Sequence, residues 1–183
     1  MKARRKRNMS DIRKAMPSDI DALELIYEHV HDAIESGAET TGWRRGIYPT
    51  RKTAEAALKR GDMFIFETDG KKPAASAIIN MIQGEEYKLC DWKIPAEPDK
   101  VMVLHTLSVD PKYTGQGIGK TFIKFYEEYA VKHGCKALRM DTNALNTKAR
   151  AMYKKLGFIE SGIIPCTFEG LDGINLVCLE KAL

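Results

Sequence analysis

The chain has 183 residues, of which 44% are hydrophobic and 30% charged, and this composition is typical of one globular domain with a substantial core. No apolar run approaches the roughly 20 residues of a membrane-spanning helix, and the N-terminus lacks the apolar stretch of a secretion signal. The sequence therefore disfavours membrane and secreted proteins, and we expect a cytoplasmic location.

The formal net charge of +4 comes from the N-terminus, where five of the 29 Lys and Arg residues lie within the first eight positions. The remaining 24 basic residues face 25 acidic ones, so the body of the chain is nearly neutral. We predict a disordered extension over residues 1–8, a domain over residues 9–183 and no nucleic-acid partner. The cysteines lack a CxxC pair, which predicts reduced structural thiols and no metal site (Cys90, Cys135, Cys166 and Cys178).

The first half of the chain predicts an edge strand, two helices and a hairpin. The strand covers residues 11–15, and Ser18 then caps a helix whose apolar face contains Ile20, Leu23, Ile26, Tyr27 and Val30. A second helix covers residues 50–60 and ends at Gly61. The Asp69-Gly70 pair predicts that the apolar runs 63–67 and 74–81 form an antiparallel hairpin.

A polar segment over residues 84–100 separates the two halves and predicts a long loop. It is either a substrate wall or an inserted strand with a plain surface loop.

In the second half, strands alternate with helices. An apolar run over residues 101–109 predicts a strand buried on both faces, and a glycine turn leads from it into a helix. The remaining elements are a parallel strand, a short helix and two closing strands (helix 118–132, strand 136–141, helix 146–156, strands 158–164 and 174–180). The order βααβββαβαββ predicts a single α/β domain with a mixed, mostly antiparallel sheet flanked by helices.

The turn itself contains three alternating glycines, Gly115, Gly117 and Gly119. Such a turn at a helix N-terminus brings backbone N–H groups together around an anionic group, most often a phosphate. The spacing disfavours a P-loop, because its first glycine would fall on Thr114. It also disfavours the dinucleotide fingerprint, because Gly-x-Gly-x-Gly is one residue too short.

The residues around the turn resemble the GNAT superfamily of N-acetyltransferases. The resemblance rests on the runs 107–113, 115–120 and 143–158, and residues 12–23 resemble the family's first strand and helix. It covers about residues 11–183. The family's phosphate loop usually opens with Arg or Gln, whereas this chain has Thr114 there and departs from the family's pattern at that position.

The resemblance implies acetyl-CoA, or a related acyl-CoA, as the donor. Its pyrophosphate would bind the backbone N–H groups of the turn, and its pantetheine arm would pair with the preceding strand. The implied cofactor-binding residues are Leu107, Ser108, Val109, Thr114, Gly115, Gln116, Gly117, Ile118, Gly119, Lys120, Thr121, Asn143, Asn146 and Ala149. Two of them have structural alternatives, because Asn146 could simply cap its helix and Lys120 could be solvated.

The resemblance also implies catalytic groups. Tyr153 matches the family's tyrosine and is the candidate general acid for the CoA thiolate, with a core aromatic as the alternative. His105 lies where some members carry a catalytic histidine, and it is a candidate base or a buried structural residue. Glu85 and Glu86 are weaker candidates, and a water chain could replace a base altogether.

We therefore expect an N-acetyltransferase that uses a ternary complex, with direct attack by a primary amine. A small-molecule acceptor is favoured because four aromatic residues could wall a pocket (Trp43, Tyr48, Tyr87 and Trp92). Exposed aromatics also mark dimer contacts, so a homodimer is a further hypothesis. Acetylation of a protein lysine or N-terminus and a non-catalytic acyl-CoA sensor remain alternatives, and Tyr153 argues against the sensor.

Overall fold

A computed structural model describes residues 11–168 and 171–183, so the predicted extension over residues 1–8 lies outside the described residues. The described residues form seven strands and four α-helices in the predicted order βααβββαβαββ. The strands are β1 (Ile12–Lys14), β2 (Met63–Glu67), β3 (Pro73–Asn80), β4 (Val101–Val109), β5 (Ala137–Asn143), β6 (Ile159–Phe168) and β7 (Leu171–Ala182). The helices are α1 (Ile20–Glu35), α2 (Arg51–Arg60), α3 (Ile118–Lys132) and α4 (Thr147–Lys155).

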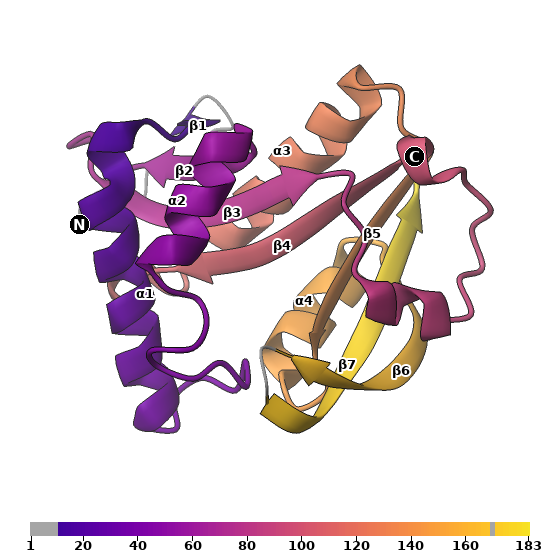
Figure 1. Ribbon diagram of the computed structural model, residues 1–183. Coiled ribbons are helices and arrows are strands. Elements are labelled where there is room, and N and C mark those ends of the chain that lie inside the picture. The colour runs from indigo at the N-terminus through magenta and orange to yellow at the C-terminus, as the bar shows by residue number, and fades with distance from the viewer. Residues whose placement is uncertain (1–10, 169–170) are drawn as a thin grey trace.

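The strands form one sheet in the order β1-β2-β3-β4-β5-β7-β6. Only β4 and β5 run parallel, whereas the other neighbouring strands are antiparallel. Helices α1 and α2 cover one face of the β1–β4 half, and α3 covers the other face (Figure 1). The mixed, mostly antiparallel sheet predicted from the sequence is confirmed.

Alternation along the strands divides the core between the two faces. In β2, Phe64 and Phe66 pack toward α3, whereas Met63 and Ile65 pack toward α1 and α2. Helix α1 contributes the apolar face that its sequence predicts, since all five residues named for it are buried. Among the described residues, no helix has both the length and the apolar character to cross a bilayer.

The start of α1 differs from the prediction. A short 3₁₀ turn, Pro17–Asp19, precedes the helix, and Ser18 is exposed and makes no cap. Asp19 is buried instead, and its carboxylate accepts from the Met16 N–H at 2.7 Å and from Arg13 Nη1 at 2.8 Å. The Asp19 carboxylate is favoured over the Ser18 hydroxyl because it accepts hydrogen bonds from both a backbone N–H and a guanidinium, and a hydroxyl accepts such bonds more weakly.

Strand β4 is less buried than predicted. It is fully covered only from Val101 to Leu104, and beyond Leu104 buried and half-buried residues alternate. The change coincides with the end of its pairing with β5, which stops at Leu104↔Met140. Past that point the two parallel strands separate into a wedge, which is visible between β4 and β5 in Figure 1.

A bulge in β4 accompanies this separation. The register with β3 shifts between Ser76↔Ser108 and Ile78↔His105, so β4 holds one extra residue there. Thr106 within it has φ of +51°, a conformation that β-branched residues rarely adopt. Its hydroxyl is hydrogen-bonded to the Tyr48 hydroxyl. The bulge reorients the second half of β4 and leaves its β5 side without a strand partner.

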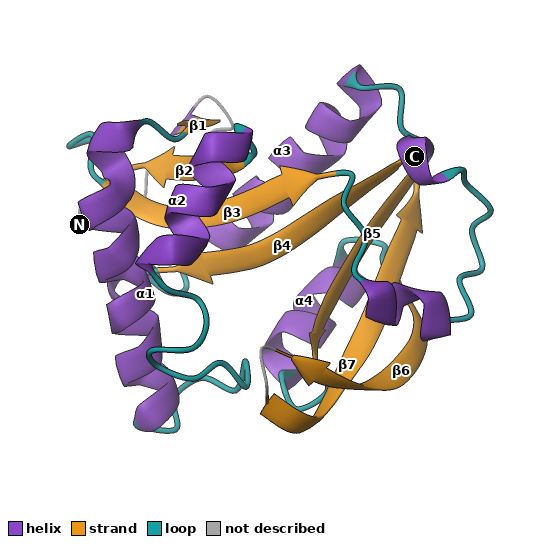
Figure 2. Cartoon of the chain, viewed as in Figure 1, coloured by secondary structure: helices purple, strands orange, loops and turns teal. Residues whose placement is uncertain are grey.

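The long segment between β3 and β4 forms two 3₁₀ turns (Glu85–Leu89 and Pro98–Lys100), and loop connects them across the β5–β7 half (Figure 2). Buried Glu180 of β7 holds this segment by accepting from the Lys93 N–H at 2.6 Å and the Ile94 N–H at 3.1 Å. Within this segment, the rings of Tyr87 and Trp92 pack against each other, with centroids 5.2 Å apart.

Candidate active site

The wedge between β4 and β5 opens into a cleft of about 540 Å³. Its walls come from the second half of β4, the glycine turn and start of α3, the end of β5, the start of α4, and the segment between α1 and α2. A cavity of this size is within the usual range for a small-molecule site. The cleft is therefore the first candidate for a functional site.

At one end of the cleft lies the N-terminus of α3. Gly117 adopts φ of +82° and precedes the helix without a side-chain cap, and the first intrahelical hydrogen bond runs from the Thr121 N–H to the Gly117 carbonyl at 3.0 Å. The N–H groups of Ile118, Gly119 and Lys120 consequently have no helical partner. With the positive end of the helix dipole they fit a pyrophosphate.

Along the cleft runs the exposed backbone edge of β4. The Asp110 N–H points toward β3, because it donates to the Ala74 carbonyl at 2.9 Å. Backbone groups alternate along a strand, so those of Val109, and of Leu107 two residues earlier, point the other way into the wedge. They provide donors and acceptors for an extended ligand with amide groups, such as a pantetheine arm.

Two titratable groups lie where the strands separate. Tyr153 of α4 is buried and lines the cleft, and burial together with the nearby Asp141 charge raises its pKa above the usual range. Asp141 is the first β5 residue beyond the last pair with β4, and it also lines the cleft. Burial raises the pKa of Asp141 to about 6, although the Tyr87 hydroxyl donates to Oδ2 at 2.7 Å and opposes this shift.

His105 lines the cleft as well, but its Nε2 atom is engaged. It lies 3.0 Å from the Ile82 carbonyl and 3.2 Å from Asn80 Oδ1, two acceptors that require the proton on Nε2. Burial lowers the pKa of His105, so the ring is neutral near pH 7. Only Nδ1 of His105 is then able to accept a proton.

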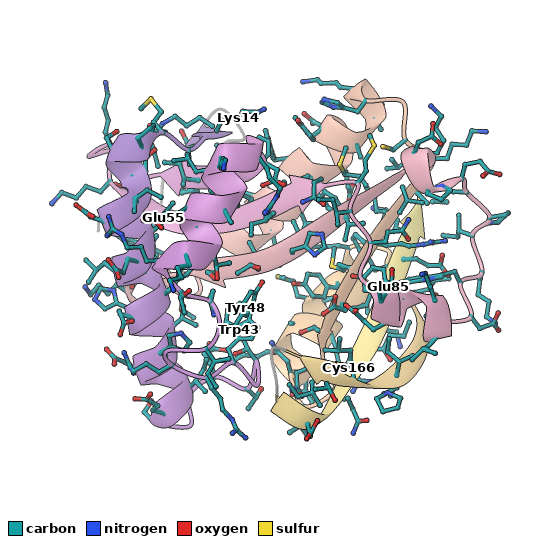
Figure 3. All side chains as sticks on the ribbon, in the orientation of Figure 1. Lys14, Trp43, Tyr48, Glu55, Glu85 and Cys166 are labelled. Atoms are coloured by element: carbon teal, nitrogen blue, oxygen red, sulfur yellow. The ribbon has the colours of Figure 1, made fainter. Side chains whose placement is uncertain are left out.

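The segment between α1 and α2 closes over the cleft. Thr40 Oγ1 donates to the Leu145 carbonyl at 3.2 Å, and Lys148 Nζ lies 3.4 Å from Glu39 Oε1. Gly42 packs so closely on the Asn143 side chain that a Cβ atom would lie 2.4 Å from its Nδ2. Figure 3 shows Trp43 and Tyr48 of the same segment between the α1–α2 half and the β5–β7 half. We call residues 38–48 the strap.

A profile of the acetyltransferase (GNAT) family matches residues 26–158, which include the whole wedge and turn. The chain belongs to the GNAT family. The resemblance that the sequence suggested is thus confirmed.

Two curated relatives of this GNAT chain are longer than it is. An uncharacterized N-acetyltransferase of Methanocaldococcus jannaschii is 35% identical over 156 residues, covering 84% of this chain and 62% of that protein. Human N-acetylaspartate synthetase is 29% identical over 119 residues, covering 63% of this chain and 39% of its own length. The chain therefore spans about 40–60% of the length of these relatives.

A GNAT acetyltransferase of Streptococcus agalactiae has the same fold, with a TM-score of 0.77, 24% identity and 94% of both chains covered.

Most of the cofactor-binding residues predicted from the GNAT resemblance line the cleft. These are Leu107, Ser108, Val109, Thr114, Gly115, Gly117, Ile118, Gly119, Lys120, Asn143, Asn146 and Ala149. Gln116 and Thr121 are not among its lining residues, and the Thr121 hydroxyl donates back to the Gly117 carbonyl at 3.2 Å. Asn146 caps α4, because its Oδ1 accepts from the Ala149 N–H at 3.1 Å, and its Nδ2 can still donate to a ligand.

The prediction of a four-membered aromatic wall is wrong. Trp43 and Tyr48 line the cleft, but Tyr87 and Trp92 are not among its lining residues, and the Trp92 indole N–H donates to the Tyr87 carbonyl at 2.9 Å. Of the acidic pair in their segment, Glu86 lines the cleft and Glu85 is exposed outside it. The sequence reasoning also missed Asp141. Its position twelve residues before Tyr153, at the end of a predicted strand, was the available signal.

Proposed function

We propose that this chain transfers an acetyl group from acetyl-CoA to a primary amine of a small molecule, by direct attack within a ternary complex. The observation that carries the proposal is the meeting of four features in one cleft. They are the uncapped N-terminus of α3, the open β4 edge, Tyr153 and Asp141. Bound acetyl-CoA would supply the activated thioester carbonyl.

Asp141 and Tyr153, the titratable groups where β4 and β5 separate, have complementary protonation states. Above pH 6 the ionised Asp141 accepts a proton from the ammonium group of the acceptor, which frees the nitrogen lone pair. The nitrogen then forms a bond to the carbonyl carbon while the carbon–sulfur bond breaks. Tyr153 donates its phenol proton to the departing sulfur, and the second proton lost by the amine restores the phenol. The products are an amide, a free thiol and one proton released to solvent.

Asp141 is favoured over His105 as the proton acceptor. It lines the cleft together with Tyr153, and its charge contributes to the raised pKa of Tyr153, which supports a role beside this phenol. His105 instead holds the turn after β3 through Asn80 and the Ile82 carbonyl. A sensor would need neither a proton acceptor nor a proton donor at this position.

A small acceptor is favoured because the strap covers the cleft. Its contacts with Leu145, Lys148 and Asn143 narrow the opening that an extended peptide would need. A protein acceptor stays an alternative, since the ribosomal-protein alanine N-acetyltransferase of Escherichia coli is 33% identical over 70 residues, which cover 38% of this chain.

The test combines acetyl-CoA with a panel of monoamines, amino acids and peptides and measures thiol release. We expect acceptor-dependent release that falls about 10²- to 10³-fold in Tyr153→Phe, while CoA binding measured by calorimetry is retained. Tyr129→Phe is the matched control, because Tyr129 of α3 does not line the cleft. Full activity of Tyr153→Phe would refute the acid role, and absence of CoA binding would refute the proposal as a whole.

A further inference from the structure

A second cavity, of about 680 Å³, adjoins the cleft behind the strap. Four residues line both cavities, namely Gly42, Trp43, Asn143 and Ile174. The second cavity also reaches the C-terminal end of α1 and residues 172–175 at the start of β7. The two cavities therefore adjoin at Trp43, the side chain that a ligand occupying both would pass.

The wall of the second cavity contains a buried histidine with an unused nitrogen. His31 is 1% exposed, and its Nε2 lies 3.0 Å from the Pro49 carbonyl, so Nε2 carries the proton. Its Nδ1 has no hydrogen-bond partner among the described residues. In the neutral ring Nδ1 is an acceptor, and leaving it buried and unpaired is unfavourable. It suits a ligand that donates an N–H or O–H.

The charged residues around this cavity determine which kind of hydrogen-bond donor it favours. Arg45 pairs with Asp32 at 2.6 Å, with Glu35 at 2.8 Å and with Glu28, so one guanidinium faces three carboxylates. Asp172 and Arg44 add one charge of each sign to the wall. The four charges of the lining balance, and the two further carboxylates that pair with Arg45 beside the cavity bring the net charge of its surroundings to about −2, which favours a cation. Trp43 at the junction offers a ring face to a cation or an apolar surface to a methylene chain.

We propose that the second cavity binds the distal ammonium group of a diamine or polyamine whose other amine is acetylated in the cleft. Nδ1 of His31 accepts an N–H of this ammonium, and the carboxylates on α1 and Asp172 supply the surrounding negative charge. The inference rests on the proposed function, because it takes the reacting amine to lie beside Asp141.

The experiment compares 1,3-diaminopropane, 1,4-diaminobutane and 1,5-diaminopentane with the monoamines of the same chain length. At least one diamine should exceed its monoamine about tenfold in kcat/KM, beyond the factor of two from its two amines. In His31→Gln, an amide N–H can replace Nε2 toward Pro49 while Nδ1 is lost. We expect the diamine-to-monoamine ratio to fall at least threefold in this variant and to stay unchanged in His133→Phe, which alters an exposed histidine after α3.

Calorimetry of the free protein with 1,5-diaminopentane and with pentylamine tests the subsite without turnover. Tighter binding of the diamine that is lost in His31→Gln supports the subsite even if no acetyl transfer is seen, and in that case the proposed function fails alone. Equal affinities for the two amines, or an unchanged ratio in His31→Gln, would overturn the inference. A preference for peptides over every diamine would overturn it as well.

Discussion

The carboxyl group of Asp141 and the phenol of Tyr153 share one end of the cleft, and burial raises the pKa of both. Tyr153 therefore keeps its proton at every working pH, since its pKa already lies near 10 without burial. Asp141, with a pKa of about 6, is ionised above neutral pH. One environment thus yields a proton donor and a proton acceptor, a separation of roles that enzymes commonly obtain by tuning pKa values.

This separation predicts a pH profile. Because Asp141 must be ionised to accept a proton, kcat/KM for the amine should rise as the pH passes through about 6 from below. A further rise at higher pH is expected from the amine itself, whose pKa is near 10. Initial rates of thiol release between pH 5 and 9 measure both steps. In Asp141→Asn, kcat should fall about 10²-fold and the inflection near pH 6 should disappear.

His105 is the other titratable candidate for the proton acceptor, so a second variant is needed to assign the inflection. Burial lowers the pKa of His105 below its ordinary value. His105→Gln should retain the inflection near pH 6, because the amide can still donate to the Ile82 carbonyl and Asp141 is untouched. If the inflection is lost in His105→Gln and kept in Asp141→Asn, the proton acceptor is the histidine.

At the scale of elements, the glycine turn depends on a left-handed residue. Gly117 has φ of +82° with open space around it, so an added Cβ would meet no atom and its cost is conformational. Gly117→Ala should lower the free energy of unfolding by about 1 kcal/mol. It should also weaken CoA binding several-fold, because relaxing this φ reorients the N–H groups of Ile118 and Gly119.

Gly134→Ala is the matched control for this prediction. Gly134 also has a positive φ, +69°, and open space, but it follows α3 at the opposite end from the cleft. Denaturant unfolding should give the two variants similar losses, while calorimetry should show weaker CoA binding only for Gly117→Ala. Equal CoA affinities for the two variants would mean that the turn does not hold the pyrophosphate.

The bulge in β4 shows where prediction from sequence ends at this scale. The apolar run over residues 101–109 gave the strand with its correct bounds. Nothing in the run reveals the extra residue, because Thr106 favours an ordinary extended backbone and takes φ of +51° only in its tertiary setting. The missed bulge explains the wrong expectation of a strand buried on both faces. Where the wedge begins depends on how β4 pairs with β3 and β5, and the sequence of β4 alone does not encode this pairing.

At the scale of the whole molecule, local signals predicted the element order and the turn that begins the site. Contacts between distant segments were not predictable in the same way. Tyr87 and Trp92 looked like pocket aromatics, but they lie on a segment whose position depends on Glu180, about ninety residues later in the chain. The raised pKa of Asp141 likewise depends on distant segments, because it comes from burial and from the Glu86 charge, while the hydrogen bond from Tyr87 opposes it.

Glu180 holds the two halves of the chain together, which gives the last prediction. Its carboxylate is fully buried and accepts from the Lys93 and Ile94 N–H groups, and it lies opposite the buried Arg139 in the β5–β7 register. Glu180→Gln keeps the shape of the side chain but removes its charge. One of the two carboxylate oxygens is replaced by an amide NH₂ group, a donor that then faces a backbone N–H. We expect a loss of about 2–3 kcal/mol in the free energy of unfolding, measured with denaturant.

Glu160→Gln provides the contrast, since Glu160 makes a surface pair with Arg150 at 2.7 Å and its loss should cost less than 1 kcal/mol. In Glu180→Gln, amide hydrogen exchange should also accelerate at residues 84–96, because their anchor is weakened. The hydrogen bond from Tyr87 lowers the pKa of Asp141, and a looser segment weakens this bond. The pKa of Asp141 should therefore rise, and the inflection in the rate profile should move above pH 6. A loss of stability without a shift of the inflection would show that the segment supports the fold and leaves the proton acceptor unaffected.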